Sequence, residues 1–247
     1  MAESVLLIPP FWLSERALRA IPGMASSIAG IESRFPLSVF KSPSLIGGPD
    51  VPPTWEGAVQ ALEEYLGPET HVIAIADGAA VALLALTRNS NRARSLVLSA
   101  FTPPDETLRS IGLGGMAAAS ETITRLTDDA WDIGMLLQGA DAEWIRGMQA
   151  EINAEVNWPY FREFGTSWES IDLVRLEPRV KVPALIQEGR GGSTGFPEGE
   201  LVGLLGRILS DYKVEHLPTW PLKLHEAQVG LELADSCLAF FERIDRQ

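Results

Sequence analysis

The sequence alternates short, continuously apolar runs with longer stretches of helical periodicity, and this alternation limits the fold more than any other feature. A strand that is buried on both faces reads as an unbroken apolar run, which is typical of parallel sheets covered by helices. Such alternation predicts a doubly wound α/β sheet with right-handed crossovers. The predicted strands are SVLLI (4–8), LSVFK (37–41), HVIAIA (71–76), RSLVLSA (94–100), VPALIQE (182–188) and YKVEHL (212–217).

Helical patterns occupy the segments between and after these runs. Thr54 precedes the first of them, and its hydroxyl is a suitable N-cap for the orphan amides of a first turn. The predicted helices are TWEGAVQALEEYLG (54–67), GAAVALLALTRN (78–89), EGELVGLLGRILS (198–210) and EAQVGLELADSCLAFFERI (226–244).

One long stretch, residues 104–180, interrupts the alternation. It contains several helix-like segments and no convincing strand, and it lies between two predicted strands of the sheet. We interpret it as a helical cap over the carboxyl ends of the strands, where open α/β sheets bind their ligands. The core then comprises residues 1–103 and 181–247. The alternative is that the aromatic residues of this stretch only pack the cap against the core. Four of the seven tryptophans lie in it: Trp131, Trp144, Trp158 and Trp168.

Charge and length exclude several classes of function. The chain has 247 residues and a formal net charge of −13, which disfavours nucleic acids and anionic membranes because both are polyanions. The beginning of the sequence shows no basic leader, and no apolar run is long enough to span a bilayer. We therefore expect a cytoplasmic protein with neither nucleic-acid nor membrane partners.

The sequence predicts no metal site and no cofactor. It contains three histidines and one cysteine, Cys237, which lies in the apolar pattern of the last helix and is expected to be a buried thiol. Two glycine-rich segments, GLGG (112–115) and GRGGSTG (189–195), lack both the lysine of a phosphate loop and the context of a dinucleotide fingerprint.

The central segments resemble the core motif of the α/β-hydrolase superfamily. The resemblance is carried by HVIAIA, ADGA, AAVALLALTRN and RSLVLSA, and by VKVPALIQEG followed by a lone histidine, His225, before the last helix. The segment SIDLVRLEPRVKVPALI (170–186) is similar to bacterial hydrolase-like proteins, some of which are fused to regulatory domains. The resemblance covers nearly the whole chain. It implies an α/β-hydrolase fold: a mostly parallel sheet of about six strands, flanked by helices, with a helical cap insertion.

The family's nucleophile position is occupied by alanine. In that family a Gly-x-Ser-x-Gly turn exposes a serine at a strained strand-to-helix corner, and small residues are needed beside it. Here residues 74–78 read AIADG, so Ala76 takes the serine position while Ala74 and Gly78 stay small. A register shifted by one would put Asp77 at the tip, as in members with a carboxylate nucleophile, but would place Ile75 where a small residue is required.

Other parts of the family's machinery are also altered. The acid position after VPALIQEG is glycine, and the nearby acidic candidates are Glu188 and Asp105. The context TPPDE favours a loop or helix-cap role for Asp105 over that of the acid. His225 keeps the histidine position, for which the resemblance implies a general base. Pro9 and Pro10 replace the family's His-Gly oxyanion motif. Because proline has no N–H, that donor must come from Phe11, Trp12 or neither.

Three hypotheses of function stay open. The first is a pseudo-hydrolase without serine-hydrolase activity that binds a small apolar molecule under the cap, with a regulatory protein as a further candidate partner. The second is an enzyme that runs lyase or cyclase-like chemistry or a proton transfer with His225, or hydrolysis through Asp77 or a water. The candidate catalytic residues are His225, Asp77 and Asp105. The third is a serine esterase whose nucleophile at 76 was replaced by alanine. The oligomeric state is not predicted. The candidate ligand-binding residues are Phe11, Trp12, Ala76, Asp77, Trp131, Trp144 and Trp158.

Overall fold

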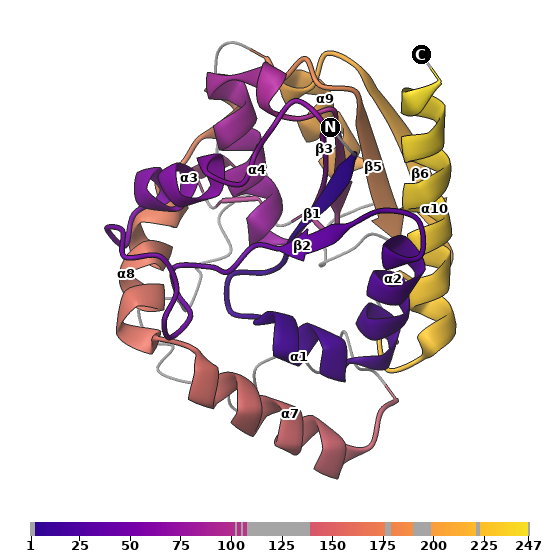
Figure 1. Cartoon of the computed structure of the whole chain (residues 1–247). Coiled ribbons are helices and arrows are strands. Elements are labelled where there is room, and N and C mark those ends of the chain that lie inside the picture. The colour runs from indigo at the N-terminus through magenta and orange to yellow at the C-terminus, as the bar shows by residue number, and fades with distance from the viewer. Residues whose placement is uncertain are drawn as a thin grey trace.

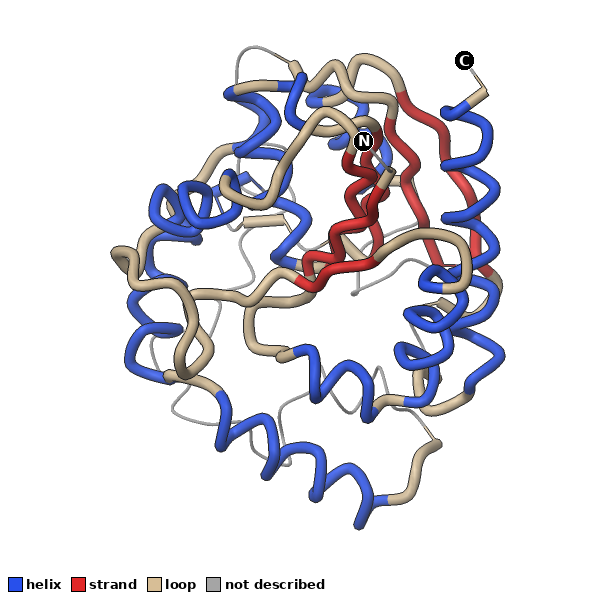
Figure 2. Tube along the Cα trace, in the orientation of Figure 1, coloured by secondary structure: helices blue, strands red, loops and turns tan. Residues whose placement is uncertain are grey.

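Six parallel strands form one sheet in the computed structural model, which describes residues 3–101, 103–104, 106–107, 139–175, 179–189, 199–220 and 223–246. The strand order is β2-β1-β3-β4-β5-β6, so that β3 and β4 are central and β2 and β6 are the two edges (Figures 1 and 2). Every predicted strand is confirmed, and all five pairings are parallel. The bounds are β1 Ser4–Ile8, β2 Leu37–Val39, β3 Thr70–Ile75, β4 Ser95–Ser99, β5 Ala184–Gly189 and β6 Tyr212–Leu217.

Helices cover both faces of the sheet because successive strand side chains point to opposite sides. Leu6, Ala74 and Leu98 belong to the apolar cluster on one face, whereas Val5, Ile73 and Val97 belong to the cluster on the other. The first face is covered by α3 Trp55–Glu63, α4 Asp77–Arg88, α8 Trp158–Glu169 and α9 Glu200–Ile208. The second is covered by α1 Glu15–Ala20, α2 Pro22–Glu32, α7 Ala142–Glu155 and α10 Ala227–Asp245. Short 3₁₀ helices lie at Ser90–Arg92 and Leu173–Arg175.

The predicted N-cap of α3 is confirmed, because the Thr54 side chain accepts the Gly57 N–H at 3.2 Å. Two helices between β1 and β2, α1 and α2, were not predicted. Neither shows an unbroken apolar stripe, since the buried face of α2 includes Gly23 and Ser27. None of the helices in the described ranges is long and apolar enough to cross a membrane.

Helices α2 and α10 pack against each other with their backbones in direct contact (Figure 1). A Cβ placed on Gly230 would lie 1.6 Å from the carbonyl oxygen of Gly23, and one on Gly30 would lie 2.8 Å from the Cβ of Ala234. The Gly23 N–H also donates to the carbonyl oxygen of Leu224 at 2.7 Å. Glycine at 23 and 230 therefore allows the two helices to close on each other.

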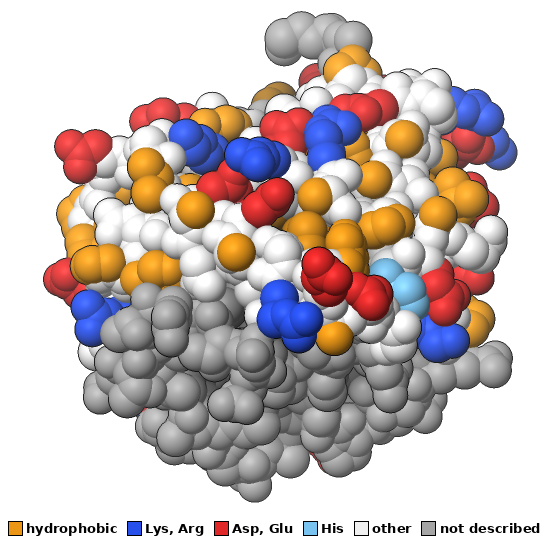
Figure 3. All heavy atoms as spheres, turned by 90° about the horizontal axis from the view of Figure 1, so that it is seen from below, with side chains coloured by type: hydrophobic (Ala, Val, Ile, Leu, Met, Phe, Trp, Pro, Cys, Tyr) orange, Lys and Arg blue, Asp and Glu red, His pale blue; other side chains and the backbone are white. Residues whose placement is uncertain are grey.

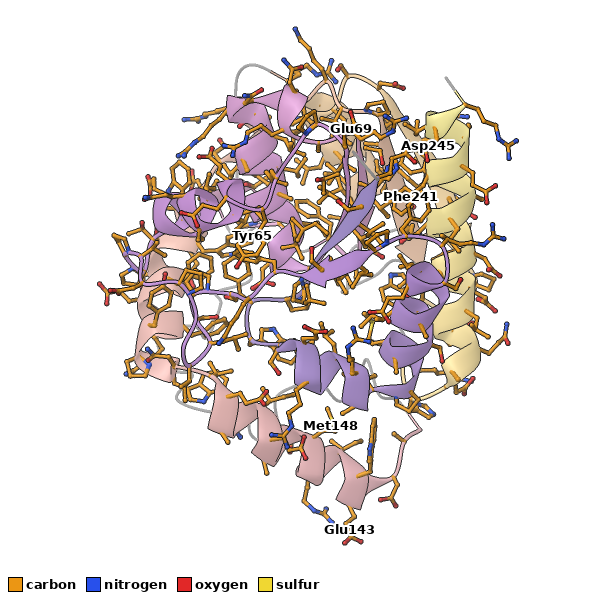
Figure 4. The ribbon with its side chains drawn as sticks, in the orientation of Figure 1. Tyr65, Glu69, Glu143, Met148, Phe241 and Asp245 are labelled. Carbon is orange, nitrogen blue, oxygen red and sulfur yellow. The ribbon has the colours of Figure 1, made fainter. Side chains whose placement is uncertain are left out.

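His71 and Cys237 are buried structural side chains. His71 Nδ1 lies 2.8 Å from Ser95 Oγ, and its ring stacks on Phe241 with centroids 4.4 Å apart. Figure 4 shows Phe241 and Asp245 on α10, the element that brings them to the amino ends of the strands. Burial lowers the pKa of His71, and burial raises the pKa of Cys237 to about 12. The expected buried thiol is confirmed.

Candidate functional site

The corner between β3 and α4 is strained at Ala76. This residue has φ 53° and ψ −124°, a conformation that side-chain-bearing residues rarely adopt. Its N–H donates to the carbonyl oxygen of Ser99 at 3.1 Å, and its own carbonyl accepts the Ala79 N–H at 3.2 Å. The strained tip therefore falls on residue 76, where the side chain is a methyl group, and Asp77 is the first residue of α4.

Gly78 lets α4 start against the end of β1. A Cβ at this position would lie 2.5 Å from the carbonyl oxygen of Pro9 and 3.0 Å from that of Ile8. Ala74, on the other side of the tip, is fully buried. At Gly78 the small residue that the sequence analysis singles out is thus required by the close approach of two backbones.

The carboxylate of Asp77 reaches across this contact to the turn after β1. The Phe11 N–H donates to Asp77 Oδ1 at 3.1 Å, and the Gly78 N–H donates to the same oxygen at 3.1 Å. Phe11 was one of two candidate donors for an oxyanion. The structure shows that its N–H already binds an anionic group, held at a helix N-terminus where negative charge is favourable.

The side chain of Phe11 belongs to the core. Its ring is 0% exposed and stacks on Phe164 of α8, with centroids 4.9 Å apart and planes at 20°. A second, tilted contact joins it to Phe40 at 6.1 Å. Trp12, the next residue, is half-buried against the apolar cluster of the α2 and α10 face. Of these two predicted ligand-binding residues, only Trp12 keeps exposed side-chain surface.

His225 lies in the loop between β6 and α10. Its Nδ1 is buried, and no hydrogen-bond partner for it is found among the residues that the structure describes. Its Nε2 is 3.9 Å from Glu226 Oε1, in a contact at the surface. A Cβ on Gly139 would lie 3.8 Å from His225 Cε1 and 4.0 Å from Nε2. The Cε1–Nε2 edge of the imidazole therefore faces Gly139, the residue at which the longest described part of the predicted cap begins.

The described part of the predicted cap packs on the N-terminal half of the chain. Helix α7 lies beside α1 (Figure 1), and Arg16 forms ion pairs with Glu151 at 3.7 Å and Glu155 at 3.8 Å. Helix α8 lies beside α3, where the Trp55 N–H donates to Ser167 Oγ at 3.1 Å. Seen from below, the described part of this side of the molecule carries charged side chains among apolar ones (Figure 3).

The cap tryptophans differ in exposure. Trp144 on α7 is half-buried and packs against the same apolar cluster as Trp12. Trp158 and Trp168 are 9% and 8% exposed; the first contacts Phe161 edge-on at 5.7 Å, and the second lies 6.0 Å from Phe164. These two side chains therefore mainly fill the core. The remaining predicted site residues, Trp131 and Asp105, lie outside the described residues, as does Gly192, the glycine at the acid position.

The carboxylate nearest in sequence to the acid position binds elements on the β6 side of the sheet. Glu188, at the end of β5, is 3% exposed and accepts the Gly199 N–H at 3.0 Å. Its other oxygen lies 3.6 Å from His216 Nδ1. Glu188 thus contacts the start of α9 and the edge strand β6.

A cluster of metal-ligand types lies at the opposite, amino-terminal edge of the sheet. Atoms of Glu3, His71 and Asp245 come within 4.8 Å of one another. Arg94 already pairs with both carboxylates, at 2.6 Å from Asp245 Oδ1 and 3.3 Å from Glu3 Oε1. Because a guanidinium neutralises these oxygens, the cluster is explained as an ion-pair network that fixes α10.

Comparisons with known proteins support the architecture. No protein-family model matches the sequence, and no curated protein matches it. Many solved structures match, and three of them each cover 98% of this chain. They are a hydrolase from Oleispira antarctica (14% identity, TM-score 0.71, 92% of that chain), the α/β hydrolase enzyme MGS-M2 from a Medee basin deep-sea metagenome library (12%, 0.63, 90%) and the enol-lactonase from Burkholderia xenovorans LB400 (13%, 0.66, 92%). Likeness at this level of identity establishes a shared fold.

Proposed function

We propose that this chain, which has the α/β-hydrolase fold, binds a small apolar molecule at the carboxyl edge of its sheet without hydrolysing it. The observation that carries the proposal is the methyl group of Ala76 at the strained tip, with φ 53° and ψ −124°. Acyl transfer at this position needs an oxygen or sulfur nucleophile, and the remaining members of a triad cannot replace it.

The Asp77–Phe11 contact argues against oxyanion chemistry at the same corner. A tetrahedral intermediate needs N–H donors that are aimed at its developing negative charge. Here the Phe11 N–H is bound by a carboxylate at 3.1 Å. An oxyanion would have to displace that group and then lie beside a like charge.

The histidine position supports the same conclusion. A catalytic imidazole is oriented by an acceptor on Nδ1, which fixes the tautomer and stabilises the imidazolium. In the described ranges the buried Nδ1 of His225 has no such acceptor, and the sequence has a glycine, Gly192, where the acid would stand.

The choice of an apolar ligand is supported by four partly exposed apolar side chains on the face that α2 and α10 cover. Ala76, Trp12, Ala140 and Trp144 all pack against one apolar cluster, and all four are half-buried. Indole rings supply large apolar contact area with a single polar N–H each. A molecule with substantial hydrophobic surface would therefore gain most of its affinity from Trp12 and Trp144.

Binding is tested with N-phenyl-1-naphthylamine, a neutral apolar fluorescent probe. The wild-type protein should bind it saturably. Trp12→Ala or Trp144→Ala should weaken binding by about tenfold, because each removes a large apolar contact. Trp55→Ala is the matched control, since Trp55 is a half-buried tryptophan that packs on the other face of the sheet. An equal affinity in all four proteins, or no saturable binding, would refute the proposal.

Hydrolysis is tested separately with p-nitrophenyl butyrate. The wild type and the Ala76→Ser variant should both show no burst of p-nitrophenol, because the acid and the oxyanion donors are not restored. A burst from Ala76→Ser would support the serine-esterase alternative. Turnover by the wild type that disappears in His225→Gln would support an enzyme of other chemistry.

A further inference from the structure

The edge strand β6 is long and exposed. It has six residues, and Tyr212, Lys213, Glu215 and His216 are exposed along it. The opposite edge, β2, has only three residues, Leu37–Val39. Short edge strands prevent pairing with other chains, whereas a long exposed edge offers a row of backbone groups to a partner.

The hydrogen-bond pattern with β5 fixes which groups of β6 point outward. The Ala184 N–H donates to the carbonyl oxygen of Asp211 at 3.0 Å. In a parallel ladder this directs the backbone groups of Lys213 and Glu215 toward β5 and those of Val214 away from it. For the outward N–H and C=O of Tyr212 and Val214, the described part of the chain provides no partner.

Two opposite charges flank Val214 on one face of the strand. Lys213 and Glu215 share the α10 face, where Glu215 Oε2 accepts the hydroxyl of Ser236 at 2.6 Å. Both side chains are exposed. The order Lys-Val-Glu is therefore self-complementary when the strand is laid antiparallel to a copy of itself about Val214.

We propose that β6 pairs antiparallel with β6 of a second copy of this chain, about a two-fold axis at Val214. The outward groups of Val214 would form two N–H···O=C bonds with Val214 of the second copy. Lys213 would lie opposite Glu215 of the second copy at a non-hydrogen-bonded position, where cross-strand side chains are closest. The two-fold axis repeats this ion pair, as in any isologous interface.

Charge complementarity selects this partner and this register. An edge lysine normally discourages pairing, because an incoming strand leaves it unpaired. A slip of the pairing to an axis at Lys213 would place lysine opposite lysine, and one at Glu215 would place glutamate opposite glutamate. Only the axis at Val214 gives two attractive pairs. Because a single strand pair buries little surface, we expect a weak dimer that depends on concentration.

Sedimentation velocity over a concentration series tests the dimer. The dimer fraction of the wild type should rise with concentration. Val214→Pro should abolish it while preserving the circular dichroism spectrum, because the lost N–H faces away from β5 and proline is tolerated at such edge positions. A wild type that stays monomeric, or a dimer that survives in folded Val214→Pro, would overturn the proposal.

Charge exchange provides a test that a folding defect cannot imitate. Lys213→Glu and Glu215→Lys should each weaken self-association by about tenfold, because each places like charges opposite each other. An equimolar mixture of the two variants should form a heterodimer, since every cross-strand pair is again attractive. Glu200→Lys, an exposed charge change on α9, should leave the dimer intact. Self-association that the single variants retain would refute the register.

Discussion

The carboxylate of Asp77 accepts the backbone N–H of Phe11 at 3.1 Å, and this bond joins the first residue of α4 to the turn that follows β1. The same carboxylate oxygen accepts the Gly78 N–H, so it satisfies two donors at a corner where two backbones meet. The bond has a structural consequence as well as a chemical one. It holds the strained tip at Ala76 against the end of a neighbouring strand.

Replacing Asp77 should therefore destabilise the fold. We expect Asp77→Ala to lower the free energy of unfolding by about 1–3 kcal/mol, because the Phe11 N–H loses its acceptor. Asp77→Asn keeps an acceptor oxygen and should cost less. Urea denaturation measures both, with Asp50→Ala, an exposed carboxylate, as control within about 0.5 kcal/mol of the wild type. Equal stability of Asp77→Ala and the control would contradict this role.

Relief of the strain at residue 76 should stabilise the protein. Glycine adopts positive φ without steric cost, but it loses more chain entropy on folding than alanine does. Because the relief of strain exceeds that loss, Ala76→Gly should raise the free energy of unfolding by about 1 kcal/mol. Ala74→Gly is the matched control, because Ala74 lies in a buried strand with ordinary geometry and should lose stability. The melting temperature should rise in Ala76→Gly and fall in Ala74→Gly. A loss of stability in both would show that the tip is not strained.

Addition of a methyl group at Gly78 should be costly. Gly78→Ala places a Cβ 2.5 Å from the carbonyl oxygen of Pro9, and we expect a loss of about 1–3 kcal/mol as α4 moves away from β1. Gly147→Ala in helix α7 is the control, since a Cβ there meets no atom of the described residues within 4 Å. This change should raise the free energy of unfolding by up to about 1 kcal/mol. Chemical denaturation that ranks Gly78→Ala at or above Gly147→Ala would contradict the close contact.

Stability should fall on acidification through His71. Burial lowers the pKa of this imidazole below its ordinary value of 6.5, with Arg94 acting in the same direction and Asp245 opposing it. The unfolded chain then binds a proton that the folded chain excludes. Stability is therefore full above about pH 6.5 and declines as the pH falls from there through the lowered folded pKa. Urea midpoints measured at pH values between about 7.5 and 5 should show this slope.

Two histidine variants test whether His71 causes this pH dependence of stability. His71→Gln removes the titrating group and should flatten the dependence, whatever its effect on absolute stability. His216→Gln, which replaces a histidine with 47% of its side chain exposed, should keep the slope. A slope that persists in His71→Gln would place its origin elsewhere.

The strands of the sheet can be predicted from the sequence, because a strand that is buried on both faces is a continuous apolar run of a few residues. The run SVLLI (4–8) and the strand Ser4–Ile8 coincide, and YKVEHL (212–217) coincides with Tyr212–Leu217. The sequence pattern does not reveal helix α2, because the helix begins at Pro22 and its buried face includes Gly23 and Ser27, with the glycine in close contact with Gly230 of α10. That contact depends on a helix far away in the sequence.

At the candidate site, too, the sequence reveals the local features but not the contacts between distant segments. The position of the tip follows from sterics that five consecutive residues reveal, so Ala76 could be identified from the sequence. The bond from Phe11 to Asp77 could not, because it forms only when the end of β1 meets the start of α4. The roles of Trp131 and Asp105 stay predictions, since both lie outside the described residues.

The contact between Gly23 and Gly230 also constrains how the chain folds during synthesis. Helix α2 emerges from the ribosome early, but the helix that covers it, α10, is translated after every strand of the sheet. Until then Met24, Ile28 and Ile31 have no α10 to cover them, and a nascent chain with exposed apolar surface is prone to aggregate or to recruit chaperones. The protein therefore completes its core only once α10 has emerged from the ribosome exit tunnel.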